Sequence, residues 1–413
     1  MTKKIIALAV AGVLGTPLVA SADGVTLYGR VAAEYGSVDI NQAAGPNNYR
    51  QSSISDNAGT SRWGLLIMED LGGGLKANAR IEYGFHTGNG VLENVREQSI
   101  GLSGQNWGAL QFGRLQSPFK DFAGGGPIDP FNDTNLQARG IGGAMYAPAN
   151  GLGGAAYVDH AVRYNSPGWG GFSMALLASP GDATQTDATT AGGNIGGKGS
   201  KANYQVGLKF KIATTGEIFG GYSHDAANDA QKAAITNGVN GDDEIVWRLG
   251  TAWNFGNFRL AAQYDKIKNA LTGNGGTTCS GDASANGAGD PGISTVQCNS
   301  SLNANGDGDI WFLTTQYKIG NTTLVLQGGE TKADSVRTAA GVLTANERKA
   351  KNLTAGAIYS LSKRTRVFGG YQRVNVDGAR TVDNIQPAGI AGVTALANQP
   401  DRSTWSIGMR HDF

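Results

Sequence analysis

Arginines occupy one face of several short segments in which apolar residues fill the alternate positions. In the first of these segments Arg30 lies between Gly29 and Val31. Successive side chains of a β-strand point to opposite faces, so such an arginine faces away from its apolar neighbours. The arginines with the clearest alternation are Arg30, Arg62, Arg80 and Arg163. The chemistry that this face offers is electrostatic, because fixed positive charge acts on water and hydrated ions.

A polar stretch that follows the early strands supplies the opposite charge. Residues 117–133 combine three aspartates with apolar residues and a triple glycine, and solvated loops rarely carry so many apolar anchors. We expect the anchors Phe119, Phe122, Ile128 and Phe131 to pack on a wall. The acids Asp121, Asp129 and Asp133 would then face the arginines across a narrow gap. Opposed charges of this kind set up a transverse field, and the volume of the loop limits solute size.

Two further arginines, Arg96 and Arg114, are also candidates for the lumen face, although the alternation around them is weaker. The pattern around residues 99–101 is poor, and Arg114 shares its parity with Phe112. For all six arginines a second interpretation stays open, in which an arginine at a strand end bonds lipid headgroups or backbone carbonyls.

Catalytic and metal-binding arrangements are not apparent. The histidines His86, His160, His224 and His411 are scattered, and residues 101–104 run into a turn, unlike a nucleophile elbow. Residues 303–309 resemble a calcium loop faintly but lack its terminal glutamate, so a solvated loop is the competing interpretation. We therefore expect no enzyme, no metal and no cofactor.

The first 22 residues have the pattern of an export signal. Lys3 and Lys4 precede an apolar run, and a small-x-small site ends at Ala22, so residues 23–413 would form the mature chain. Removing both lysines leaves 32 basic against 33 acidic residues, which implies neither nucleic acid nor a polyanion as partner. In an oxidising compartment Cys279 and Cys298 are expected to form a disulfide, with two unpaired thiols as the alternative. Closing this loop should stabilise it by about 3 kcal/mol on the chain-entropy model.

Glycine content and alternation indicate a chain made of strands. The chain has 64 glycines and 11 prolines, which disfavours helix interiors. Short turns such as residues 69–74 alternate with longer polar connections, an asymmetry typical of outer-membrane barrels. We place the longer connections at about 37–59, 118–155, 179–200, 226–242, 269–308, 332–350 and 377–401.

The pattern predicts an all-β fold, a transmembrane antiparallel barrel of about sixteen strands with a wet lumen. The last strand alternates Trp405, Ile407 and Met409 with polar residues and ends in Phe413, which we expect to act as the C-terminal assembly signal. A charge on the lipid side costs about 2–4 kcal/mol near the midplane, so the strand arginines should project into the lumen.

Several segments together resemble the trimeric Gram-negative general porins that include the neisserial and Burkholderia-type proteins. They are residues 25–30, 61–64, 69–77, 96–102, 112–115, 361–365 and 408–413. The resemblance implies a sixteen-stranded barrel with an inward-folded third loop, a homotrimer among outer-membrane lipids and lipopolysaccharide, and passive diffusion of small hydrophilic solutes. Its wall-basic positions map onto Arg30, Arg62, Arg96, Arg114 and Arg163, and its loop acids onto Asp121, Asp129 and Asp133.

Three alternatives remain at this point. A barrel enzyme would need a clustered Ser/His or acid constellation near the outer rim. A plugged adhesin or structural barrel would not conduct, and a substrate-specific channel would show saturable flux. We expect instead a passive diffusion channel with a weak preference for anions.

Overall fold

The computed structural model describes residues 24–41, 49–56, 61–88, 90, 92–138, 157–179, 202–225, 243–269, 307–337, 343–345, 347–377 and 401–413. The expected export signal at residues 1–22 and the expected disulfide between Cys279 and Cys298 lie outside these residues. Among the described residues, no helix has both the length and the apolar character needed to cross a membrane.

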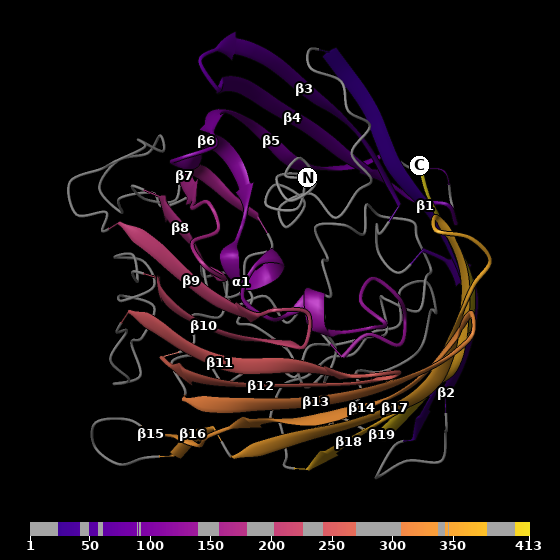
Figure 1. The fold of residues 1–413 in the computed structure, drawn as a ribbon. Coiled ribbons are helices and arrows are strands. Elements are labelled where there is room, and N and C mark those ends of the chain that lie inside the picture. Colours follow the sequence, from indigo (N-terminus) through magenta and orange to yellow (C-terminus); the bar gives the residue numbers. More distant parts are fainter. Residues whose placement is uncertain are drawn as a thin grey trace, which may run out of the picture.

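Nearly all of the described chain forms strands, joined in one closed sheet (Figure 1). The wall strands are β1 (Gly24–Asn41), β2 (Tyr49–Ser55), β3 (Arg62–Gly72), β4 (Leu75–Phe85), β5 (Leu92–Gly104), β6 (Gly108–Gln116), β7 (Tyr157–Asn165), β8 (Phe172–Ser179), β9 (Asn203–Ile212), β10 (Gly216–Asp225), β11 (Glu244–Phe255), β12 (Phe258–Lys268), β13 (Gly308–Ile319), β14 (Thr322–Ala333), β17 (Arg348–Ser360), β18 (Thr365–Asp377) and β19 (Asp401–Asp412). A separate small hairpin is formed by β15 (Val336–Arg337) and β16 (Leu343–Ala345).

The ring closes where the first strand meets the last. Residues 30–41 of β1 pair antiparallel with β19, while its other edge pairs with β2 near one end and with β3 near the other. The 17 strands of this sheet therefore fill sixteen wall positions, because β2 and β3 share one. The predicted sixteen-stranded antiparallel barrel is confirmed.

Two of the expected long connections contain strands instead. Residues 37–41 and 49–55, expected between about 37 and 59, extend β1 and form β2. Residues 34–40 of β1 pair antiparallel with residues 49–55 of β2. This pairing satisfies backbone N–H and C=O groups that a loop would leave to water. The connection expected at 332–350 likewise holds the small hairpin.

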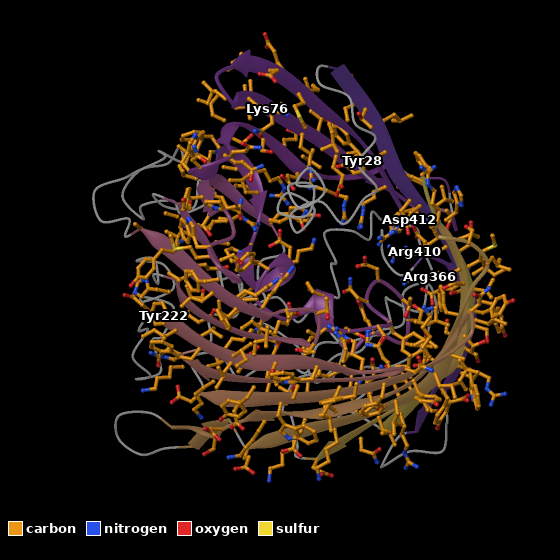
Figure 2. The ribbon with its side chains drawn as sticks, in the orientation of Figure 1. Tyr28, Lys76, Tyr222, Arg366, Arg410 and Asp412 are labelled. Atoms are coloured by element: carbon orange, nitrogen blue, oxygen red, sulfur yellow. The ribbon has the colours of Figure 1, made fainter. Side chains whose placement is uncertain are left out.

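Alternation sorts the side chains between the two faces of the wall. Along β13, Trp311 and Leu313 are exposed, whereas Ile310, Phe312 and Thr314 are buried. Figure 2 shows side chains projecting from both faces of the ribbon. Short hairpins close one end of the strands, and the φ of +59° at Gly256 and +57° at Gly320 is one that glycine adopts without strain.

Residues 117–138, which we call the inner segment, lie within the ring of strands in Figure 1. The segment contains a short helix α1 (Pro118–Asp121) and a 3₁₀ turn η2 (Gly126–Ile128). Ser117 caps α1, since its hydroxyl oxygen accepts a hydrogen bond from the Lys120 amide at 3.2 Å.

Three of the four expected anchors of this segment are buried, and the fourth is partly buried. Phe119 packs with residues of β11–β13, and Ile128 packs with Phe219 and Phe312. Phe131 packs on the side chains of β14, β17 and β18 together with Leu136. Phe122 is partly buried against the cluster of Ile128. The apolar residues of the segment thus hold it against the wall.

Candidate functional site

The inner segment meets the wall arginines at one carboxylate. Asp133 accepts a hydrogen bond at 2.7 Å from Arg30 Nη1, and the same Oδ2 atom lies 3.8 Å from Arg62 Nη1. Arg30 and Arg62 come from directly opposed positions of β1 and β3, so their side chains leave the same face of the sheet. Asp133 has a φ of +65°, in the left-handed region that aspartate tolerates better than most residues.

A second carboxylate, Glu82 of β4, connects the next arginines of the wall. It accepts hydrogen bonds from Arg96 Nε at 2.6 Å and from the Tyr28 hydroxyl at 2.8 Å, and it lies 3.9 Å from Arg62 Nε. Glu82 is 3 % exposed, so its charge is held in place by these donors. A glutamate on the polar face of its strand is visible in the sequence, but it was not among the predicted site residues.

Arg80 forms its own pair beside this group. Its Nη1 atom lies 2.9 Å from Glu97 Oε2 on the neighbouring β5. Glu97 and Arg96 are consecutive, yet both interact with side chains of the polar face of β4. The pairing register between β4 and β5 shifts between Ile81 and Tyr83, and this bulge explains how two successive residues reach the same side.

The remaining predicted arginines lie away from Asp133. Arg163 Nη1 is 2.9 Å from Asp121 Oδ2 at the foot of the inner segment. Arg114 donates from Nε to the carbonyl oxygens of Val95 at 3.1 Å and Arg96 at 3.0 Å, and its Nη1 lies 2.5 Å from Asp159. Bonding to carbonyls is the alternative that the sequence left open for Arg114.

The third predicted acid, Asp129, serves the backbone of its own segment. Its Oδ1 atom accepts from the Phe131 amide at 2.9 Å, and Oδ2 accepts from the Ala138 amide at 2.7 Å. The side chain is buried, so it is placed to hold the fold of the segment. Of the three predicted acids, it is Asp133 that pairs with Arg30 and Arg62.

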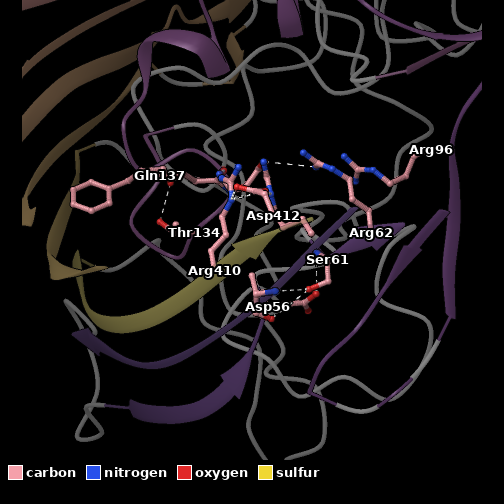
Figure 3. A network of polar contacts seen from close by, with 12 residues as sticks. Asp56, Ser61, Arg62, Arg96, Thr134, Gln137, Arg410 and Asp412 are labelled. Atoms are coloured by element: carbon pink, nitrogen blue, oxygen red, sulfur yellow. Dashed lines mark hydrogen bonds and ion pairs between the residues drawn. The ribbon is translucent and has the colours of Figure 1, made fainter. Parts of the chain in front are cut away.

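Residues near the C-terminus join the same group, although they were not among the residues predicted from the sequence. Arg30 Nε lies 2.7 Å from Asp412 Oδ1, and Arg410 Nε lies 3.1 Å from the same atom. Arg366 is directly opposed to Arg410 on the neighbouring strand, and both side chains lie close to Asp412 in Figure 2. In Figure 3, Arg62 and Arg96 project toward the region of Arg410 and Asp412. Arg410 has the opposite parity to the exposed Ile407 and Met409. Strand alternation alone would therefore have placed it on the lumen side.

Wall side chains also hold the backbone of the inner segment. Arg248 Nη1 donates to the carbonyl oxygens of Phe119 at 2.7 Å and Ala123 at 3.1 Å. Gln263 Oε1 accepts from the Gly125 amide at 2.7 Å, and both oxygens of Glu34 accept from the Asn135 amide at 3.0 Å. These bonds cross more than a hundred positions of sequence, which is why no local pattern predicts them.

Phe413 lies at the seam of the barrel. Its amide donates to the Gly29 carbonyl at 3.0 Å, and the Gly29 amide donates to the Phe413 carbonyl at 3.1 Å. A Cβ atom at Gly29 would overlap the Phe413 ring, so the ring covers the glycine. The last residue therefore completes the pairing between the two ends of the chain.

A family model described as Gram-negative porin matches residues 7–379. The chain belongs to this family. An outer membrane porin protein of Bordetella pertussis is 28% identical over 373 residues, which cover 83% of this chain and 87% of the relative. Outer membrane porin protein 32 of Delftia acidovorans is 27% identical over 423 residues and covers all of both chains.

Solved porin structures share the fold. The anion-selective porin from Comamonas acidovorans has a TM-score of 0.65 at 21% identity, covering 95% of this chain and 100% of that one. A trimer form of OmpT of Vibrio cholerae has a TM-score of 0.57 at 14% identity, with coverages of 95% and 100%. The protein is thus a porin of the Gram-negative outer membrane, a channel and not an enzyme.

Proposed function

We propose that the porin is a passive diffusion channel for ions and small hydrophilic solutes, filtered between the wall arginines and the inner segment. The observation that carries the proposal is the contact of Arg30 and Arg62 with Asp133, at 2.7 and 3.8 Å, because it joins wall and segment at one point of the lumen. Solutes would cross beside this contact, where the lumen is narrowed by the segment.

The charges around the contact favour a weak preference for anions. The basic members are Arg30, Arg62, Arg80, Arg96, Arg366 and Arg410, and the acidic members are Glu82, Glu97, Asp129, Asp133 and Asp412. Arg366 Nε is buried and has no hydrogen-bond partner among the described residues. Fixed positive charge in excess raises the local concentration of anions.

The assembly and the surroundings of the barrel are part of the same proposal. We infer a homotrimer, supported by the trimer form of OmpT that shares this fold, embedded among outer-membrane lipids and lipopolysaccharide. The expected export signal at residues 1–22 and assembly signal at Phe413 fit delivery to that membrane.

Planar bilayers test this function. Purified protein should add conductance in steady steps, with currents linear in salt concentration and a reversal potential on the anion side under a salt gradient. Absence of any conductance step from folded protein would overturn the proposal in favour of a plugged barrel. Saturation of solute flux at millimolar concentration would replace it by a substrate-specific channel.

A further inference from the structure

A single aromatic ring joins the foot of the inner segment to the arginines of the wall. The ring centroid of Tyr157, the first residue of β7, lies 3.9 Å from Lys120 Nζ. The same centroid lies 5.4 Å from Cζ of Arg96 and 5.4 Å from Cζ of Arg114. A cation within about 6 Å of a ring centroid, over the ring face, is attracted by the negative charge of that face. One ring therefore holds together three cations that would otherwise repel one another.

The three cations around the ring come from three different elements. Arg96 belongs to β5, Arg114 to β6 and Lys120 to helix α1 of the inner segment. Tyr157 is directly opposed to Gln116, the last residue of β6, so β7 begins beside the point where the inner segment leaves the wall. The ring is thus placed between the wall and the segment.

Two carboxylates orient the arginines at the edge of the ring. Glu82 Oε1 accepts a hydrogen bond from Arg96 Nε at 2.6 Å and lies 3.5 Å from the Tyr157 hydroxyl. Arg114 pairs with Asp159 through Nη1. The side chains of Arg96 and Arg114 stay 16% and 31% exposed, so ions in the lumen can approach both guanidinium groups.

The two ends of the inner segment present opposite charges to the wall. At one end Asp133 contacts Arg30 at 2.7 Å. At the other end Lys120, which is partly exposed, contacts the ring. Its acidic neighbour Asp121 lies 2.9 Å from Arg163 Nη1, so that carboxylate is directed to another part of the wall.

The ring and the carboxylate of Asp133 join segment and wall in different ways. A carboxylate cancels part of the charge of the cations that it holds. A phenol ring is neutral and holds cations through its quadrupole, so it brings them together without cancelling their charge. Positive charge therefore persists at the Tyr157 end, and fixed positive charge raises the local concentration of anions.

We propose that Lys120 is a specificity-determining residue of the channel and that Tyr157 positions it against Arg96 and Arg114. The inference rests on the proposed function, because it names the place along the inner segment where the preference for anions arises. Anions pass between segment and wall at the Tyr157 end, where both sides carry positive charge, and cations are disfavoured there.

Reversal potentials under a salt gradient, recorded from the full-length protein in planar bilayers, test the role of Lys120. The variant K120Q should lower the ratio of chloride to potassium permeability about twofold, because it removes one fixed positive charge from the narrowed part of the lumen. The matched control K363Q removes a lysine from the short turn between β17 and β18 and should keep the wild-type ratio. An unchanged ratio in K120Q, or an equal fall in K363Q, would overturn the proposal.

Three replacements of Tyr157 test the role of the ring. Y157F keeps the ring and should keep the wild-type ratio, whereas Y157L removes the ring and should lower the ratio about as much as K120Q does. Y157E offers the cations a carboxylate, so it should lower the ratio further by cancelling their charge. A wild-type ratio in Y157L, or the same fall in Y157F as in Y157L, would overturn the positioning role.

The double variant Y157L/K120Q shows whether the ring acts through the lysine. Its ratio should lie closer to that of K120Q than to the product of the two single effects, because residues that act together are not additive. Fully multiplicative effects would overturn the positioning role. Electrophoretic mobility of unheated and heated protein shows that each variant is folded, and K120Q decides the proposal if Y157L is not.

The same recordings separate this inference from the proposed function. A wild-type protein without any preference for anions would overturn the proposed preference, and this inference with it. A wild-type preference that both K120Q and Y157L leave intact would overturn this inference alone.

Discussion

Arg248 of β11 and Asp265 of β12 form a bidentate ion pair beneath the inner segment. Arg248 Nε lies 2.8 Å from Asp265 Oδ1, and Nη2 lies 2.7 Å from Oδ2. Both side chains are at most 2% exposed, and the remaining Nη1 atom of Arg248 donates to two carbonyls of the segment. The guanidinium also lies 4.4 Å from the Phe119 ring centroid, so one side chain fixes helix α1 to the wall.

Replacing Arg248 by methionine should release the foot of the inner segment. We expect a loss of about 3–5 kcal/mol in the free energy of unfolding, because Asp265 would be left as a buried, uncompensated charge. Single-channel records should become noisier as the segment moves. Denaturant titration and bilayer recording measure the two effects.

The double variant R248M/D265L is the control for this interpretation. It removes the buried charge together with its partner, so it should regain most of the stability while the recordings stay noisy. Quiet channels in the double variant would show that Arg248 does not position the segment.

Arg30 and Arg62 should contribute to the preference for anions. The variant R30S/R62S is expected to lower the ratio of chloride to potassium permeability about twofold. A twofold change corresponds to a free-energy difference of about 0.4 kcal/mol. Reversal potentials under a salt gradient give this ratio. The control R259S/R364S removes two arginines close to the short turns and should leave the ratio unchanged; an unaltered ratio in R30S/R62S contradicts the proposed filter.

Asp133 and Asp129 should respond differently to the same change. D133N removes the negative charge beside Arg30 and Arg62, so the anion preference should rise while stability changes little, since asparagine tolerates a φ of +65°. D129N keeps one acceptor oxygen where two backbone amides now bond, so it should destabilise the segment by about 1–3 kcal/mol. Reversal potentials and thermal unfolding separate the two roles, and equal behaviour of both variants would refute the assignment.

The general architecture was predictable because alternation persists along most strands. The outward Trp405, Ile407 and Met409 and the inward Thr404 and Ser406 follow the expected order, and strand number followed from turn spacing. Register shifts were not predictable. At Gly113, with a φ of +131°, the pairing of β6 with β7 becomes irregular. Strict alternation therefore does not predict that Arg114 faces the same side as Phe112.

Partners within the site were harder to predict than its arginines. Asp121, Asp129 and Asp133 are chemically alike and close in sequence, yet they bond Arg163, backbone amides, and Arg30, respectively. Their roles depend on how the inner segment lies against strands far away along the chain. Local composition identified the segment, whereas tertiary contacts decided which carboxylate serves which group.

Closure of the barrel at Gly29 gives the last prediction. A Cβ atom there would overlap the Phe413 ring and lie 2.6 Å from the Arg62 carbonyl oxygen, which belongs to backbone and cannot move away alone. G29V should therefore weaken the seam between β1 and β19, with a cost of about 1–3 kcal/mol or more. The control G168V changes a glycine whose Cβ would have nothing within 4 Å. Electrophoretic mobility of unheated and heated protein measures the folded fraction, and a G29V barrel as heat-resistant as G168V would show that Phe413 does not need the bare glycine.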